Sequence, residues 1–172
     1  MKLTFDSKIE HLDKLKLNYI TVPKDQLEKS FDKEKDASLY NQRFTIEINK
    51  KVSWRGGSVV LGEEKAYITF SKQRMKEAEV DLGDVVAVEL EKDNSEYGFD
   101  VPQEWIAAIE QDPMAKEMFE ELTMGRRRSI IYLVIQYKTV EKRIERSLFF
   151  LENLKRSPRG KTTMRHILGK DL

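Results

Sequence analysis

The chain has 172 residues, of which 40% are apolar and 35% are charged, and it contains 4 Pro, 8 Gly, 2 His and no Cys. This composition is typical of a folded globular protein and excludes a wholly disordered chain. The absence of cysteine excludes disulfides, thiol catalysis and cysteine-ligated zinc, and the two histidines leave little for a histidine metal site. The sequence therefore predicts no metal and no cofactor.

The net charge of +1 hides a strong asymmetry along the chain. Residues 126–172 hold 13 Lys and Arg against 4 Asp and Glu, whereas residues 1–125 hold 18 against 26. One interpretation is that the basic segment neutralises an acidic body within the fold. The alternative is a surface that faces a polyanion.

The N-terminal residues carry charges at Lys2, Asp6, Lys8 and Glu10, so they match neither a signal peptide nor a transit peptide. The longest apolar run, residues 130–135, is far below the roughly 20 residues that span a bilayer. We therefore expect a cytoplasmic protein that does not insert into a membrane.

The pattern from residue 15 to residue 93 is that of short strands. Residues 15–22 alternate, and residues 23–31 are predicted to form a short helix with Pro23 at its first position. Between residues 42 and 93 apolar side chains recur at every second position, as in Phe44, Ile46 and Ile48, with a helix expected over residues 71–79. Five or six strands of this length predict a small antiparallel barrel.

After residue 96 the apolar spacing changes to three and four, which is typical of helices. Helices are expected over residues 103–111, after Pro113 and over residues 126–156, where one helix or two stays open and a break near Thr139 is favoured. The sequence thus predicts an α+β protein with a β-barrel domain (1–96), a helical region (97–156) and a basic flexible tail (157–172), in which a short helical piece is expected at 165–168.

Several motifs resemble two bacterial families. Residues 19–93 resemble a small bacterial barrel domain of unknown function, on Trp54-Arg-Gly-Gly-Ser-Val-Val and on Leu82-Gly-Asp-Val-Val-Ala-Val-Glu-Leu-Glu-Lys-Asp93. The following region resembles the YdeI/OmpD-associated (bacteriocin-protection) family. The residues that carry this second resemblance are Asp100-Val-Pro102, Phe119, Leu122, Arg126-Arg-Arg128 and Lys138-Thr-Val-Glu141-Lys-Arg143-Ile-Glu-Arg146.

The resemblance implies a six-stranded, double-split β-barrel followed by helices, in a bacterial cytosolic protein without an established catalytic activity. Lys142 and Ser147 depart from the family pattern, which has Thr and an apolar residue at these positions. The name of the family points to bacteriocin or envelope stress and supplies no mechanism.

Three groups of side chains are candidates for ligand binding. Trp54 and Arg55 precede two glycines, so they are expected in a loop that either stacks a base or forms a hairpin with Trp54 at a barrel end. Arg126, Arg127 and Arg128 suit a phosphate, although consecutive helical residues point about 100° apart. A third group, formed by Lys138, Glu141, Arg143 and Arg146, offers an anion site shared with the barrel or a solvated helix face of ion pairs.

No nucleophile with a neighbouring base and no pair of carboxylates in an apolar setting can be identified. The sequence therefore predicts a non-enzymatic binding module, monomeric or homodimeric, with a protein or small-molecule partner that it does not identify. The alternative is a nucleic-acid-associated protein that uses the Trp54 loop and the basic C-terminal segment for weak, salt-sensitive polyanion binding.

Overall fold

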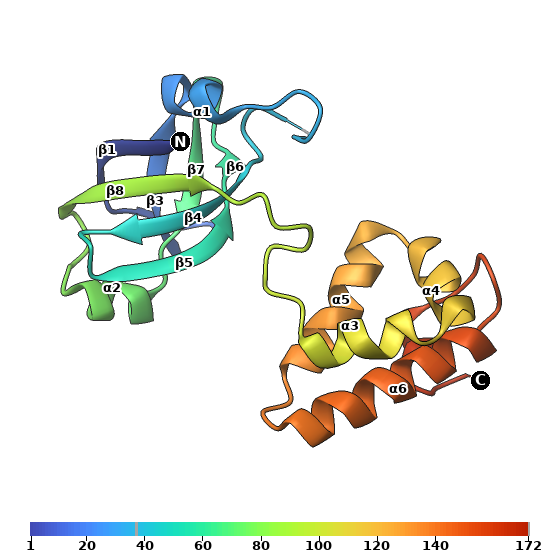
Figure 1. The fold of residues 1–172 in the computed structure, drawn as a ribbon. Helices are drawn as coiled ribbons and strands as arrows, with labels where there is room; N and C mark the ends of the chain where they lie inside the picture. Colours follow the sequence, from blue (N-terminus) through green and yellow to red (C-terminus); the bar gives the residue numbers. More distant parts are fainter. Residues whose placement is uncertain (37, 172) are drawn as a thin grey trace. The chain divides into compact units, whose positions relative to one another are not determined.

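A computed structural model describes residues 1–36 and 38–171 (Figure 1). The chain divides into two compact units, one of residues 1–98 and one that begins at Phe99. The first unit, called the β unit here, contains two antiparallel sheets and two short helices. The second, called the helical unit, contains five helices among its described residues. The architecture is α+β, as the change of periodicity predicts.

The β unit contains two four-stranded sheets. Sheet A has the order β1 (Lys2–Lys8), β8 (Val85–Lys92), β4 (Arg43–Ile48) and β5 (Val52–Gly57). Sheet B has the order β2 (Glu10–Leu12), β3 (Leu17–Pro23), β7 (Lys65–Thr69) and β6 (Val59–Val60). Helices α1 (Lys24–Ser30) and α2 (Lys72–Ala78) complete this unit.

The two sheets enclose one apolar core, to which both contribute alternate residues. Phe44, Ile46 and Ile48 are fully buried on β4, as the period of two predicts. The chain passes from β5 to β6 at Ser58, whose amide donates to Gln42 O at 2.8 Å. Beside β1, the amide of Thr21 donates to Ser7 Oγ at 3.0 Å.

The structure differs from the expected six-stranded closed barrel. It has eight strands in two sheets, and no ladder among the described residues closes them into a barrel. Strands β1 and β2 were not expected, because the charges of the N-terminal residues were used only as evidence against a signal or transit peptide. Leu3 and Ile9 are nevertheless buried, so the charges occupy only the outer positions of these strands.

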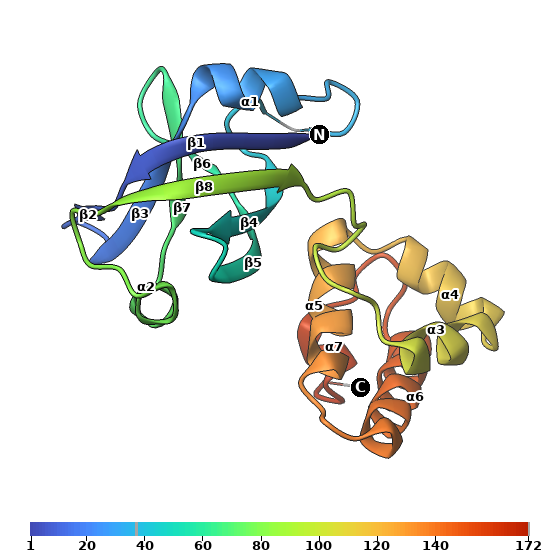
Figure 2. The same cartoon turned by 60° about the vertical axis from the view of Figure 1, so that its left-hand side comes forward.

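The helical unit is arranged around its longest helix, α6, which contacts each of the other four (Figure 2). Its helices are α3 (Gln103–Glu110), α4 (Pro113–Glu120), α5 (Met124–Ile135), α6 (Val140–Arg156) and α7 (Met164–Ile167). The segment 126–156 forms two helices, because Thr139 caps α6 by accepting a hydrogen bond from the amide of Lys142. The favoured break near Thr139 is confirmed.

Residues 157–171, expected to be a flexible tail, fold back onto the rest of the helical unit. Ile167 on α7 is 1% exposed, and Asn153 Nδ2 on α6 donates to its carbonyl at 2.9 Å. Ser157 and Thr162 are also buried, with 2.7 Å between their hydroxyl oxygens. The short helix expected at residues 165–168 is α7, one residue earlier.

Candidate functional site

Trp54 is a residue of strand β5, so its expected position in a loop is wrong. The Trp54 ring stacks on that of Phe70 with 5.5 Å between the ring centroids. Arg74 Cζ lies 4.6 Å from the centroid of the Trp54 ring. A Cβ on Gly56 would come within 3.0 Å of Ile46 Cδ1, so glycine serves close packing there rather than a turn. The Trp54 ring is therefore already engaged within the β unit.

Arg55 is exposed on β5, where it faces Thr45 of β4 in the ladder. Its charge acts on Asp93 together with that of Arg43. Burial opposes ionisation of Asp93, yet hydrogen bonds from Ser95 and the two guanidinium groups keep its pKa below the ordinary value. Arg55 thus contributes to the electrostatics of the β unit.

The three consecutive arginines of α5 have different surroundings. Arg127 donates from Nε to Leu122 O at 3.0 Å and from Nη2 to Glu120 O, so it satisfies carbonyls at the end of α4. Arg128 Cζ lies 5.7 Å from the ring centroid of Phe99. Arg126 is exposed and borders a very small cavity of about 40 Å³. The structure does not bring the three together.

Arg143 and Lys138 meet at the turn between α5 and α6. Arg143 Nη1 donates to the carbonyls of Tyr137 and Lys138, both at 3.1 Å, and Nη2 donates to Glu104 Oε1 at 2.8 Å. The Lys138 side chain is exposed. Arg143 therefore holds the end of α5 and the start of α3 against α6, which is a structural task.

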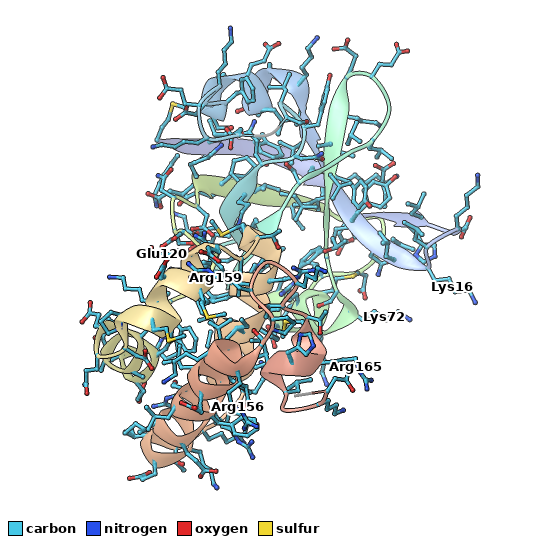
Figure 3. The ribbon with its side chains drawn as sticks, turned by 90° about the vertical axis from the view of Figure 1, so that its right-hand side faces the viewer. Lys16, Lys72, Glu120, Arg156, Arg159 and Arg165 are labelled. Carbon is cyan, nitrogen blue, oxygen red and sulfur yellow. The ribbon has the colours of Figure 1, made fainter. Side chains whose placement is uncertain are left out.

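The basic C-terminal segment finds acidic partners on α3 and α4. Arg143 pairs with Glu104, Lys155 with Asp112 at 2.8 Å, and Arg159 with Glu117 and Glu121. Figure 3 shows Arg156, Arg159 and Arg165 on this C-terminal part of the chain. Much of the charge asymmetry is thus neutralised inside the helical unit, which supports the first of the two interpretations.

These ion pairs predict that acid weakens the helical unit. Hydrogen bonds from Arg143, Lys155 and Arg159 lower the pKa of Glu104, Asp112 and Glu121 respectively. The folded state then binds fewer protons than the unfolded state, so the stabilisation is complete above the ordinary carboxyl pKa of about 4 and is lost as the pH falls through the folded values.

The melting temperature of the helical unit, measured against pH, checks this expectation. Arg159→Gln should flatten the acid limb, because the pKa of Glu121 in the folded state then returns towards its ordinary value in the unfolded state. Replacement of the exposed Lys161, which has no ion pair in the part of the chain that the structure describes, serves as the control. A wild-type melting temperature that stays constant across the carboxyl range would contradict the expectation.

A shallow depression collects several motif residues of the helical unit. It has a volume of about 230 Å³ and is lined by Asp100, Pro102, Glu104, Ile135 and Arg143. Two larger open depressions, of about 620 and 660 Å³, lie on the β unit. Within the described residues, no group of three or more His, Asp or Glu is arranged to hold a metal ion.

Ser147, where the motif departs from the family pattern, is fully buried, and its hydroxyl has no hydrogen-bond partner. An unpaired buried hydroxyl is destabilising, and alanine has the higher helix propensity. Ser147→Ala should therefore stabilise the helical unit by about 1 kcal/mol in urea unfolding. The control is Ser129→Ala on the exposed face of α5, which should change stability little. Destabilisation by Ser147→Ala would contradict the assignment of an unpaired hydroxyl.

No described helix is both long and apolar enough to cross a membrane. A search of the curated proteins finds no match to this chain. Residues 98–157 match a family model described as Bacteriocin-protection, YdeI or OmpD-Associated. The matched segment begins one residue before the helical unit and ends one residue after α6. The family resemblance stated from the motifs of residues 100–146 is thereby confirmed by a match over residues 98–157.

Proposed function

We propose that this chain is a non-enzymatic binding module that acts in the cytoplasm through its helical unit. The observation that carries the proposal is a row of apolar side chains left exposed on α6. Val140, Ile144 and Leu148 are 49%, 43% and 54% exposed. They lie within the segment that matches the family, whose name links it to bacteriocin protection.

The row is continuous along the helix. Residues four apart lie on one face of an α-helix, so the three side chains form a single apolar strip. The row borders the buried face of α6, since Ser147 and Leu151, three and seven residues after Ile144, are buried. An exposed strip beside a filled core suits an amphipathic protein segment that packs its own apolar face against it.

The charges beside the row indicate the chemistry of that partner. Three exposed glutamates lie next to the row on the surface of α6: Glu141, Glu145 and Glu152. Glu145 pairs with the exposed Lys142, and an exposed pair of this kind contributes little and exchanges readily. Glu152 pairs with Lys155, which is half-buried and also pairs with Asp112. A two-fold pairing of two α6 helices places acidic residues opposite acidic residues, which disfavours a second copy. The preferred partner is a protein segment with basic side chains beside its apolar face.

The double-split barrel remains our proposal for the β unit. Two observations support this proposal. Strand β5 of sheet A continues through Ser58 directly into strand β6 of sheet B, and the two sheets share one apolar core. The nucleic-acid alternative is not carried forward, because Trp54 is packed by Phe70 and Arg74 and because Lys155 and Arg159 pair with carboxylates.

Site-specific photo-crosslinking in the host cell tests the proposal. A photoreactive side chain at Ile144 should capture a discrete protein, whereas the same group at the exposed Lys161 should not. The captured protein, once purified, should bind the full chain at least about 10-fold more weakly after Leu148→Glu, because truncating or charging a central apolar contact typically has an effect of this size. Lys161→Glu is the control.

Two outcomes contradict the proposal. One is equal capture from both positions, which indicates random collision. The other is unchanged affinity after Leu148→Glu, with the far-ultraviolet circular dichroism of the variant matching that of the wild type.

A further inference from the structure

We propose that the guanidinium group of Arg146 binds an oxyanion of the carboxylate or phosphate class. Arg146 lies on α6 between two aromatic rings. Its Cζ is 5.4 Å from the ring centroid of Tyr137 and 5.4 Å from that of Phe149. The residue as a whole is half-buried.

The hydrogen-bonding capacity of Arg146 is unused, in contrast to that of neighbouring arginines. Its Nε is buried and has no hydrogen-bond partner. In the described part of the chain, Arg146 makes neither an ion pair nor a hydrogen bond, whereas Arg127 and Arg143 each donate to several oxygens. A buried donor without an acceptor is rare in a native fold and calls for an explanation, such as a bound group that accepts from it.

The aromatic contacts prepare the arginine for this role. Ordering a free arginine side chain opposes binding, and the two rings have already restricted Arg146 before a ligand arrives. The planar guanidinium presents parallel N–H groups whose spacing matches two oxygens of a carboxylate or a phosphate. The adjacent carboxylate of Glu145 is paired with Lys142 at 2.8 Å, so it does not compensate Arg146 by an ion pair.

This site is distinct from the row of the proposed function. Ile144 and Arg146 are two residues apart, so their side chains leave α6 in directions roughly 200° apart. The oxyanion site and the apolar row therefore lie on different sides of the same helix. Failure of one proposal leaves the other standing, because each is tested with its own variants.

Nuclear magnetic resonance of the full chain tests the inference through the Nε–Hε signal of Arg146. Inorganic phosphate and acetate are titrated separately, each against sodium chloride at matched ionic strength. A saturable shift of the Arg146 signal with either oxyanion, beyond that with chloride, is the expected result. Phosphate alone, acetate alone or both then identifies which oxyanion source the site accepts. The exposed Arg156, on the same helix, should show only the chloride-like response.

Two variants separate a guanidinium site from general charge attraction. Arg146→Lys keeps the charge and loses the planar fork, so it should weaken oxyanion binding at least about 10-fold when binding is followed by calorimetry. Arg156→Gln should leave the affinity unchanged. Tyr137→Leu keeps the guanidinium but removes one ring, so the Arg146 signal should saturate only at higher ligand concentration.

The inference is overturned if phosphate and acetate shift the Arg146 signal no more than chloride does. It is also overturned if Arg146→Lys binds as well as the wild type. If Arg146→Lys fails to fold, the Tyr137→Leu titration decides, and an unchanged midpoint in that variant overturns the clamped-arginine site.

Discussion

Gly98→Ala is expected to destabilise the β unit strongly. Gly98 has a φ of +78°, and a Cβ built there would lie 1.5 Å from Nη2 and 2.1 Å from Cζ of Arg43. Backbone strain of this kind is worth about 1–3 kcal/mol, and a forced shift of packed atoms adds about 1–3 kcal/mol. We expect a loss of at least about 2 kcal/mol in the free energy of unfolding.

The loss is large because the guanidinium of Arg43 is not free to move without consequence. It lies 3.8 Å from the carboxylate of Asp93, whose side chain is only 4% exposed. Displacing Arg43 leaves a buried carboxylate with less compensation. Urea unfolding, followed by the amide signals of β4 and β8, measures the effect on the β unit.

Gly62→Ala is the matched control for Gly98→Ala. Gly62 has a similar φ of +71°, but nothing lies within 4 Å of its built Cβ. It therefore reports backbone strain alone, about 1–2 kcal/mol. Equal losses in the two variants would show that the close approach of Arg43 to Gly98 contributes nothing.

Ile167→Ala is expected to destabilise the helical unit by about 2–5 kcal/mol, the usual range for a buried isoleucine. Ile167 is 1% exposed on α7, whereas its neighbour Leu168 is 41% exposed. Leu168→Ala removes a similar side chain from an adjacent position and should have a small effect. The difference between the two losses of stability therefore reports how far burial of the Ile167 side chain stabilises the C-terminal segment, because the two positions are adjacent in the chain.

Thermal unfolding of the two variants, followed by the amide signals of α6, gives the comparison. A large difference supports a docked α7, which the hydrogen bond from Asn153 to the carbonyl of Ile167 also holds in place. Small and equal effects would indicate instead that residues 157–171 form the mobile tail that their composition predicts.

The periodic elements were predictable from the sequence. The alternation of Phe44, Ile46 and Ile48 gave β4, because one face of a strand enters the core. The polar break at Thr139 gave the division between α5 and α6, since a threonine side chain satisfies an amide at a helix start. Both features depend on neighbours in the chain, which is why local patterns suffice for them.

Features that depend on distant partners were not predictable. The charges of β1 obscured its alternation, and Leu3 enters the core between them. The basic residues after Arg156 suggested a mobile tail, but Ile167 and Thr162 are buried against elements far away in sequence. At Trp54, paired glycines suggested a loop, and only the approach of Ile46 shows why a strand needs glycine there.

The candidate site was predicted in part. Asp100, Pro102 and Arg143 belong to motifs of the resembling family, and they line one depression. Arg146 was grouped with Lys138 and Arg143 as an anion site or a face of ion pairs, but its buried nitrogen without a partner between two rings could not be predicted from the sequence. The exposure of the apolar row of α6 was not predictable, since residue spacing does not reveal which side of a helix its neighbours cover.

The basic C-terminal segment mainly neutralises the acidic helices of its own unit. Carbon-detected titration of the side-chain carboxyl groups of Glu104, Asp112 and Glu121 in the full chain measures this neutralisation. We expect midpoints below ordinary values for all three and a return of the Glu121 midpoint to the ordinary range in Arg159→Gln. Ordinary midpoints in the wild type, unaffected by Arg159→Gln, would contradict it.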